Sequence, residues 1–550
     1  MSSFSRVASV SDLADGEMRQ VQADGTDVLL SRIDGQFYAC TAFCTHYGAP
    51  LETGILDGPM VVCPWHHAAF DVTTGALCEP PALDALRSFE VRVDGDDVYV
   101  RVPADADEHG TGVDYRTSDG EPEAMAGFVP AVDDRLFLII GAGAAGQAAA
   151  EALRQQGYRG RLALVTHEAH APYDRTKLSK AYLAGAAGDD ALRLRDGAFY
   201  ERHGIEVWTG RTVTGLDPDT QTVIFADHDP VSYDVALVAT GGTPRRLPIP
   251  GADLDGVLLL REWKDVEALN RYAEGASSVA IIGSSFIGME AAASFRGRGL
   301  DVTVIGREEE PLAAALGDKV GRVFREAAEA KGVQFKLGAD VEAIETVHAD
   351  VDAGTPRRLR VSIGEESVEA DLVLLGVGVE PATSFLEGVS FRREDGGLTT
   401  DASLRIAPRL FAAGDVAAYP ESRLGEHVRI EHWRLAQQHG RTAARNMLTE
   451  DDATLEPMTF EAIPFFWTGQ FGISLRYVGH VEGWDEVLID GSLAERTFLA
   501  AYVSGGSIRA VAAVGRDKDA IAFYRLLAHG DEPTPGEFVG ADLQALLAAR

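Results

Sequence analysis

The chain has 550 residues, and its 85 Asp and Glu outnumber its 50 Lys and Arg, which gives a formal net charge of −35. A surface this negative repels phosphate backbones and anionic lipids, so we expect neither nucleic acid nor a membrane as a partner. The sequence contains no run of 18 apolar residues and no signal-peptide profile at its start, and we expect a cytoplasmic protein. Apolar residues make up 46% and charged residues 25%, which indicates a globular chain long enough for several domains.

The pattern along the chain changes several times. Residues 4–102 read as short alternating strands with Asp-Gly turns, which predicts a small all-β domain. From Arg135 onward strands alternate with Ala-rich helical segments, which predicts α/β domains with parallel sheets. Two of these units open with a glycine-rich turn, and the second unit is inserted between the halves of the first. The predicted division is an all-β domain (1–103), an acidic flexible linker (104–132), a first nucleotide domain in two halves (133–253 and 384–457), a second nucleotide domain (254–383) and an α+β C-terminal domain (458–550).

Four cysteines, Cys40, Cys44, Cys63 and Cys78, all lie in the N-terminal domain. In a reducing compartment such a group favours metal or redox chemistry over a disulfide framework. We expect Cys40 and Cys78 to be small buried apolar residues.

Two Cys–His pairs stand out: Cys44-Thr45-His46 and, after residues 47–62, Cys63-Pro64-Trp65-His66. Two such pairs on two loops can hold a [2Fe–2S] cluster, with thiolates on one iron and neutral imidazoles on the other. The pattern resembles the Rieske ferredoxin family, which implies that Cys44, His46, Cys63 and His66 are the cluster ligands. A zinc site made of the same residues is the alternative, although zinc ligands usually group the two Cys and the two His.

The same resemblance bears on the reduction potential. High-potential Rieske proteins have a disulfide between the cluster loops and Ser and Tyr hydroxyls beside the cluster; the corresponding residues here are Ala49, Trp65, Ala68 and Phe70. Hydrogen bonds to sulfur stabilise the reduced cluster, so their absence lowers the potential. We expect a value of about −150 mV, and a redox titration giving more than roughly +100 mV would contradict this.

The first glycine-rich turn follows the apolar segment LFLII and precedes a helical segment. Strand, G-x-G-x-x-G and helix in succession form the dinucleotide fingerprint, here with Gly141, Gly143 and Gly146. Glu168 follows the next strand, where a carboxylate can accept hydrogen bonds from a ribose. Later segments place Thr240, Gly241 and Asp415 at strand ends. These elements resemble the two-dinucleotide-binding flavoprotein reductases, which implies that the first fingerprint and these residues bind FAD.

The second fingerprint has Gly283 and Gly288, but Ser285 replaces the central glycine. By the same resemblance this unit binds NAD(P)H, and a Cβ at Ser285 crowds the approach of the pyrophosphate. A Rossmann-like domain that binds no nucleotide is the alternative. The preference between NADH and NADPH stays open, because Arg307 favours a 2′-phosphate whereas Glu308 to Glu310 oppose it.

Four further segments resemble the apoptosis-inducing-factor-like and oxygenase-coupled ferredoxin reductases: residues 172–180 (PYDRTKLSK), 376–381 (GVGVEP), 431–433 (EHW) and 464–468 (PFFWT). Together with the N-terminal motif, the resemblance covers nearly the whole chain. It implies that Arg175 contacts FAD and that Lys180 lies near the flavin, paired with Glu290, which faces the nicotinamide. It also implies that Trp433 and Gly378 contribute to cofactor binding.

These features predict an NAD(P)H-dependent oxidoreductase that passes electrons through FAD to its own [2Fe–2S] cluster and on to an acceptor such as an oxygenase or haem protein. The sequence has no cysteine after residue 78, which excludes thiol chemistry near the flavin. Because the chain is acidic, we expect an acceptor protein with a basic docking face. The chain itself is expected to be a monomer or a homodimer. One alternative is a slow redox sensor of the apoptosis-inducing-factor type. Another is a complete Rieske oxygenase using His427 and His432, although His432 belongs to the reductase motif.

Overall fold

The computed structural model describes residues 3–104, 125–347, 358–386, 388–450, 452 and 454–549. Most of the expected linker, residues 105–124, lies outside these ranges. Its last part lies against the first nucleotide domain, where the Ala126 and Val129 N–H groups donate to the carbonyls of Arg154 and Arg159.

The N-terminal domain consists of two antiparallel sheets, as its alternating pattern predicts. Both potential ligand loops belong to it: Cys44 and His46 follow β4, and Cys63 and His66 lie between β6 and β7. One sheet has the order β1 (Ser5–Ser9), β10 (Asp97–Arg101), β9 (Ser88–Asp94), β4 (Gln36–Thr41), β3 (Thr26–Ile33), β2 (Met18–Ala23). The other has the order β5 (Ile55–Asp57), β6 (Met60–Val62), β7 (Ala69–Asp71), β8 (Leu77–Glu79).

The main sheet of the first nucleotide domain is parallel except for one edge strand (Arg405–Ala407). Its strand LFLII is buried along its whole length because elements cover both faces. Its chain returns after the second domain to add β30 beside β17, which confirms the nested order. The sheet runs β13 (Ile205–Trp208), β12 (Arg161–Val165), β11 (Leu136–Ile140), β17 (Val235–Val238), β30 (Leu410–Ala412), β29 (Arg405–Ala407). Small sheets comprise β14 (Val213–Asp217), β15 (Thr222–Phe225) and β16 (Val231–Ser232), then β28 (Leu398–Thr399), β31 (Ala417–Glu421) and β32 (Glu426–Arg429); the helices are α1 (Ala144–Gln155), α2 (Gly197–Arg202) and α6 (Trp433–Met447).

The second nucleotide domain repeats this plan. It is joined to the first through the antiparallel pair β18 (Gly242–Pro244) and β27 (Val379–Pro381). Its main sheet runs β19 (Val257–Leu258), β26 (Leu372–Leu375), β20 (Ser278–Ile282), β21 (Asp301–Ile305), β22 (Gln334–Lys336). A smaller sheet holds β23 (Ala343–Val347), β24 (Arg358–Ile363) and β25 (Glu366–Ala370), and the helices are α3 (Trp263–Ala273), α4 (Phe286–Gly297) and α5 (Ala313–Glu329).

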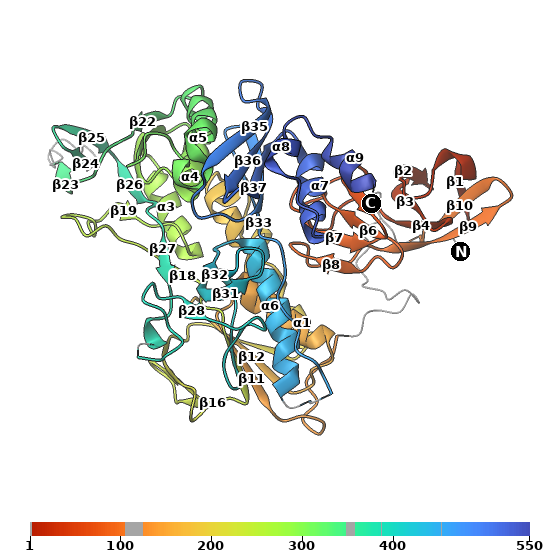
Figure 1. The fold of residues 1–550 in the computed structure, drawn as a ribbon. Coiled ribbons are helices and arrows are strands. Elements are labelled where there is room, and N and C mark those ends of the chain that lie inside the picture. Colours follow the sequence, from red (N-terminus) through yellow and green to blue (C-terminus); the bar gives the residue numbers. More distant parts are fainter. Residues whose placement is uncertain are drawn as a thin grey trace.

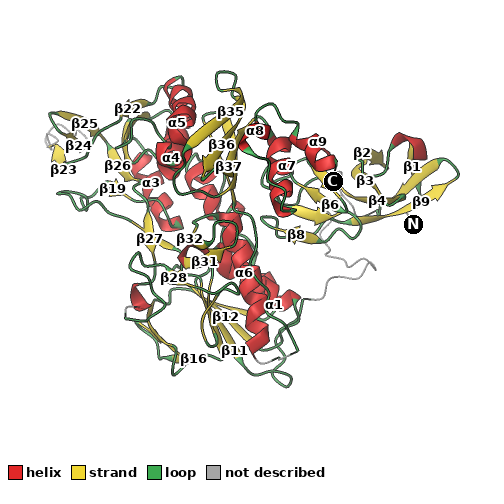
Figure 2. Ribbon diagram, in the orientation of Figure 1, coloured by secondary structure: helices red, strands yellow, loops and turns green. Residues whose placement is uncertain are grey.

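The C-terminal domain is α+β, as expected. Its antiparallel sheet runs β33 (Phe465–Gln470), β34 (Ile473–Gly479), β37 (Ser507–Val514), β36 (Thr497–Ser504), β35 (Glu486–Ser492), followed by α7 (Asp517–Ala528), α8 (Pro535–Phe538) and α9 (Leu543–Ala548). Figure 1 shows this domain between the second nucleotide domain and the N-terminal domain, with α7 beside β6 and β7. Figure 2 shows that helices gather in the nucleotide and C-terminal domains, whereas the N-terminal domain is mostly strands and loops.

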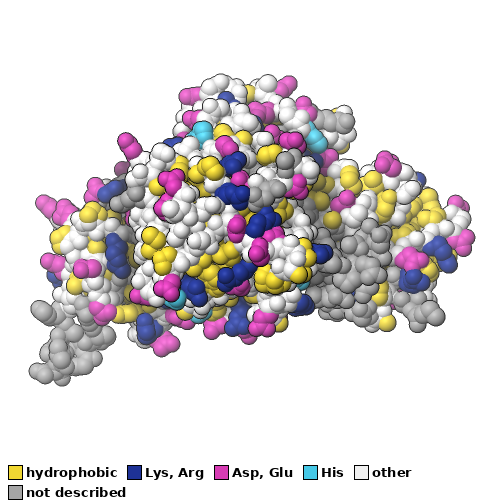
Figure 3. Space-filling model, turned by 90° about the horizontal axis from the view of Figure 1, so that it is seen from below, with side chains coloured by type: hydrophobic (Ala, Val, Ile, Leu, Met, Phe, Trp, Pro, Cys, Tyr) yellow, Lys and Arg dark blue, Asp and Glu magenta, His cyan; other side chains and the backbone are white. Residues whose placement is uncertain are grey.

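The surface charge is dispersed on the face seen in Figure 3, where Asp and Glu side chains lie among Lys and Arg side chains instead of forming one block. Across the part of the chain that the structure describes, no helix combines the length and the apolar character needed to cross a lipid bilayer.

Candidate functional site

The four predicted cluster ligands converge from two loops of the N-terminal domain. The thiols of Cys44 and Cys63 are hydrogen-bonded to each other and almost fully buried. The Nδ1 atoms of His46 and His66 lie 3.0 Å apart. The two sulfurs therefore form one pair and the two imidazoles another.

This paired arrangement distinguishes a two-iron cluster from a single zinc ion. Ligand atoms around one zinc, each about 2.0–2.3 Å from it, lie within about 4.6 Å of one another. A search of the described residues for three or more His, Cys, Asp or Glu side chains with ligand atoms within 4.8 Å of one another finds one group, His167, Glu168 and Glu262. No three of the predicted cluster ligands form such a group. The Cys and His pairs are thus too widely spread for one ion, and they fit a [2Fe–2S] cluster with one pair on each iron.

Burial keeps the two histidines in the neutral form that metal ligands need. It lowers the pKa of His46 to about 4 and that of His66 to about 2. The hydrogen bond between the thiols raises the pKa of Cys44 and lowers that of Cys63.

The remaining cysteines differ from each other. Cys40 is fully buried, and burial raises its pKa to about 12, as expected of an inert apolar residue. Cys78 is only half-buried.

Backbone hydrogen bonds close both cluster loops. They run from the Cys44 N–H to the Ala49 carbonyl and from the Cys63 N–H to the Ala68 carbonyl.

A cavity of about 760 Å³ lies between the two nucleotide domains and β33. It brings together residues that are far apart in the sequence and that were predicted to bind FAD or to act in hydride transfer. The predicted residues that line it are Gly141, Gly143, Glu168, Arg175, Lys180, Thr240, Gly241, Glu290, Asp415 and Trp433.

The glycines of the first fingerprint divide into two kinds. A Cβ on Gly141 would lie 2.1 Å from the Ala239 carbonyl oxygen, and one on Gly146 would lie 1.9 Å from that of Gly141. A Cβ on Gly143 would meet no atom within 4 Å. This open cradle lies at the N-terminus of α1, where backbone N–H groups favour an anion, and it fits the pyrophosphate of FAD.

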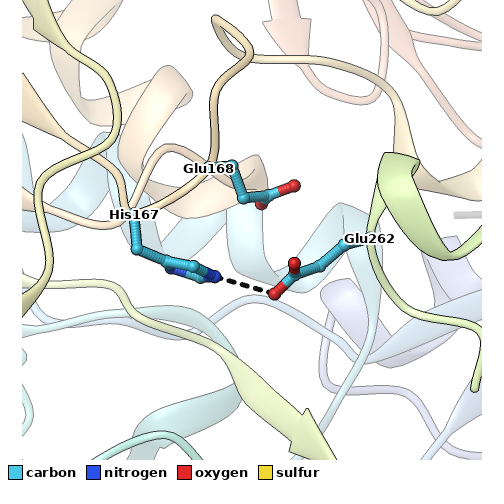
Figure 4. A group of neighbouring side chains, drawn as sticks. All are labelled: His167, Glu168 and Glu262. Atoms are coloured by element: carbon cyan, nitrogen blue, oxygen red, sulfur yellow. Dashed lines mark hydrogen bonds and ion pairs between the residues drawn. The ribbon is translucent and has the colours of Figure 1, made fainter.

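Glu168 is buried at the end of β12, where it accepts hydrogen bonds from Arg175 and, at 2.7 Å, from the Tyr173 hydroxyl. Figure 4 shows Glu168 beside a hydrogen bond of 2.7 Å between His167 Nε2 and Glu262. This bond holds the pKa of Glu262 at about 2. Lys264 Nζ lies 2.6 Å from Glu262 and Arg175 pairs with Glu168, so cations already neutralise these carboxylates. The group therefore suits a polar cofactor end better than a metal ion.

Lys180 and Glu290 form the pair predicted from the sequence, with Lys180 Nζ 2.8 Å from Glu290 Oε2. Glu290 is buried and also accepts from Ser179 Oγ at 2.5 Å and from Thr468 Oγ1 at 2.7 Å. Asp415 pairs with Arg261 Nη2 at 2.9 Å. Sequence reasoning missed Ser179, Thr468 and Arg261.

Other predicted residues lie away from the cavity: Gly146, Gly283, Ser285, Gly288, Arg307 and Gly378 do not line it. Ser285 is the N-cap of α4 in an extended conformation (φ −88°), which a side chain tolerates. Arg307 is exposed and pairs with Asp340 at 2.7 Å. Gly378, with φ 90°, lies in the connection between β26 and β27.

Three consecutive aromatic residues of β33 contact the other domains. The Phe465 ring stacks on His67 at 3.9 Å between centroids, and Phe466 contacts Phe286 at 5.0 Å. Trp467, which lines the cavity, has its ring 4.4 Å from that of His66, a predicted cluster ligand. The segment was recognised from its sequence, but nothing in the sequence indicated that Trp467 meets a ligand of the N-terminal domain.

The N-terminal domain is held in this position by polar and apolar contacts. On α6, the fully buried Arg434 donates from Nε to the Pro80 carbonyl at 2.8 Å, and Gln438 donates to Glu79 at 2.6 Å. On α7, Ile521 packs against Val62 and Ala69. The N-terminal domain is therefore packed against α6 and α7.

Comparison with known proteins gives a consistent result for each domain. Residues 136–440 match the family model of pyridine nucleotide-disulphide oxidoreductases, residues 3–90 that of the Rieske [2Fe-2S] domain, and residues 465–547 that of the reductase C-terminal domain. Human apoptosis-inducing factor 3 is 35% identical over 95% of this chain and 84% of its own length. Rhodocoxin reductase from Rhodococcus erythropolis is 33% identical over 75% of this chain and 94% of its own.

Solved structures agree with the reductase part. The ferredoxin reductase for the CYP199A2 system from Rhodopseudomonas palustris has a TM-score of 0.69 and 29% identity, covering 75% of this chain and 100% of that one. The covalent putidaredoxin reductase–putidaredoxin complex has a TM-score of 0.69 and 28% identity, covering 76% and 99%.

Proposed function

The chain belongs to the pyridine nucleotide-disulphide oxidoreductase family, with FAD, NAD(P)H and a Rieske [2Fe–2S] cluster as its cofactors, and from this premise we propose that it passes electrons from NAD(P)H through FAD to its own cluster and on to an external acceptor. The single observation that carries the proposal is the contact of Trp467 with His66, because Trp467 also lines the cavity that holds the predicted FAD residues.

The residues of the site have separate tasks in this proposal. The fingerprint turn with Gly141, Gly143 and Gly146 holds the pyrophosphate of FAD, while Glu168 and Arg175 fix its ribose end. The flavin supplies hydride acceptance and one-electron release when bound. Glu290 fixes the position of the Lys180 ammonium, and together they orient the nicotinamide and exclude water.

The fused cluster domain makes the acceptor part of the same chain. Because donor and acceptor share one chain, electron transfer between them does not depend on the concentration of a separate protein. The external acceptor has a basic docking face in this proposal, because the chain carries a charge of −35.

Stopped-flow mixing with NADH under anaerobic conditions tests the route. We expect bleaching of the flavin absorbance, followed by reduction of the cluster with its rhombic electron paramagnetic resonance (EPR) signal. Flavin bleaching without cluster reduction would contradict the proposal. Steady turnover with ferricyanide separates a reductase from a redox sensor of the apoptosis-inducing-factor type, which would be reduced slowly and stoichiometrically.

A further inference from the structure

The residue after the cluster ligand His46 connects the two halves of the site. The Tyr47 ring stacks on the His46 imidazole, with centroids 3.8 Å apart and planes 15° apart. Its hydroxyl donates a hydrogen bond of 2.6 Å to Oδ2 of Asp174, which lies in the first nucleotide domain. Asp174 belongs to the segment that carries Arg175 and Lys180, so one hydrogen bond joins a cluster loop to the flavin-binding segment.

Asp174 is well suited to hold this bond. The residue is only 4% exposed, and its other oxygen, Oδ1, accepts from the Thr176 N–H at 2.9 Å and from Thr176 Oγ1 at 2.6 Å. Oδ2 thus remains for Tyr47, with Lys177 Nζ 3.8 Å away. Lys177 Nζ also lies 5.1 Å from the centre of the Tyr47 ring, where a cation is attracted to the aromatic face.

Further hydrogen bonds connect Asp174 with Lys180 and Glu290, the pair proposed to orient the nicotinamide. Thr176, held by Asp174, accepts at its carbonyl from Lys180 Nζ at 3.2 Å, and Lys180 Nζ reaches Glu290. A displacement of the cluster loop therefore removes a partner from a buried carboxylate that orders the Lys180 segment. Hydrogen bonds to charged groups are stronger than neutral ones, and an unpaired buried group is costly.

We propose that Tyr47 is a positioning residue that fixes the His46 loop of the cluster domain in its electron-accepting position, by stacking on His46 and hydrogen-bonding to Asp174, while contacts with α6 and α7 hold the rest of the domain. This inference rests on the proposed function for its consequence, electron transfer within the chain, but the contact itself is independent of that function. Tyr47 touches a cluster ligand and a flavin-segment residue, not the substrate.

The variant Tyr47→Phe in the holoprotein removes the hydroxyl and keeps the ring on His46. Loss of one hydrogen bond to a charged group makes the position of the cluster loop seen in the structure less populated. We therefore expect the rate of electron transfer from flavin to cluster to fall about tenfold, when it is divided by the amount of cluster measured by EPR. Hydrogen–deuterium exchange over residues 44–48 and 174–178 should become faster. The potential and EPR g-values of the cluster should stay unchanged, because the ligands and the stacked ring remain.

Tyr38→Phe is the matched control, since the Tyr38 hydroxyl donates to Gln36 within the same domain. Equal rates and equal exchange in Tyr47→Phe and the unmodified protein would overturn the proposal. So would the same slowing in Tyr38→Phe, or altered g-values without altered exchange. If Tyr47→Phe loses cluster, Asp174→Ala removes the acceptor of the Tyr47 hydroxyl with the cluster domain unaltered, and unchanged exchange over 44–48 would then overturn the proposal. If NADH fails to reduce the cluster of the unmodified protein, the proposed function fails, and the exchange experiment still decides the role of Tyr47.

Discussion

The two glycine-rich units share a strand–turn–helix arrangement but differ at the middle of the three fingerprint glycines, which is Gly143 in the first unit and is replaced by Ser285 in the second. In both, the outer glycines lie against backbone oxygens: a Cβ would be 2.1 Å away at Gly141 and 2.2 Å away at Gly283. The middle residue is the N-cap of the following helix and is extended in both, with φ −81° at Gly143 and −88° at Ser285. The fold therefore requires the outer glycines, whereas the middle glycine leaves room for a ligand, which is why Ser285 is compatible with an intact domain.

The largest effect should come from the outer glycines. Gly146→Ala and Gly288→Ala place a Cβ 1.9 and 2.1 Å from a carbonyl oxygen, so the backbone must shift. We expect each to lower the free energy of unfolding by about 2–4 kcal/mol in urea denaturation. Gly143→Ala is the control, since its Cβ meets no atom within 4 Å, and equal destabilisation by all three variants would break the comparison.

A smaller effect should separate the acidic residues that follow the second strand of each unit. Glu168 is buried with Arg175, whereas Glu308 is exposed and its side chain accepts a long hydrogen bond of 3.3 Å from Ser284. Glu168→Gln leaves the Arg175 charge without its partner, and we expect FAD affinity to fall about 10–100-fold in a fluorescence titration. Glu308→Gln should change the KM for NADH less than about fivefold, because exposed groups contribute little. Equal losses would show that the two units bind their nucleotides alike.

The smallest effect should come from the middle position. Ser285→Gly removes the side chain that crowds the pyrophosphate, and we expect the KM for the nicotinamide nucleotide to fall about two- to fivefold. The urea midpoint should not change, because the backbone there is extended. A raised KM would mean that the Ser285 hydroxyl binds the nucleotide.

Much of the fold could be predicted because it depends on neighbours in sequence. The strand β11 is apolar throughout, and β12 and β20 are apolar after a polar first residue, as buried parallel strands are. A glycine turn follows β11 and β20. The four predicted cluster ligands could be named because two short Cys–His motifs resemble those of the Rieske family. The contacts of Tyr47 with Asp174, and of Thr468 with Glu290, could not be predicted, because each joins residues more than a hundred positions apart and no motif pairs them. The equally distant pair Lys180 and Glu290 could be predicted only through the family resemblance.

By itself, the sequence determined the cofactor chemistry and the order of the domains, since thiols, imidazoles, glycines and the period of apolar residues act over short stretches of chain. The tertiary structure alone decided where the cluster domain lies. Its position depends on surfaces that meet only after each domain has folded, where Trp467 reaches His66 and Arg434 is buried against Pro80. Such complementarity depends on shape and burial in three dimensions, and no local pattern in the sequence carries it.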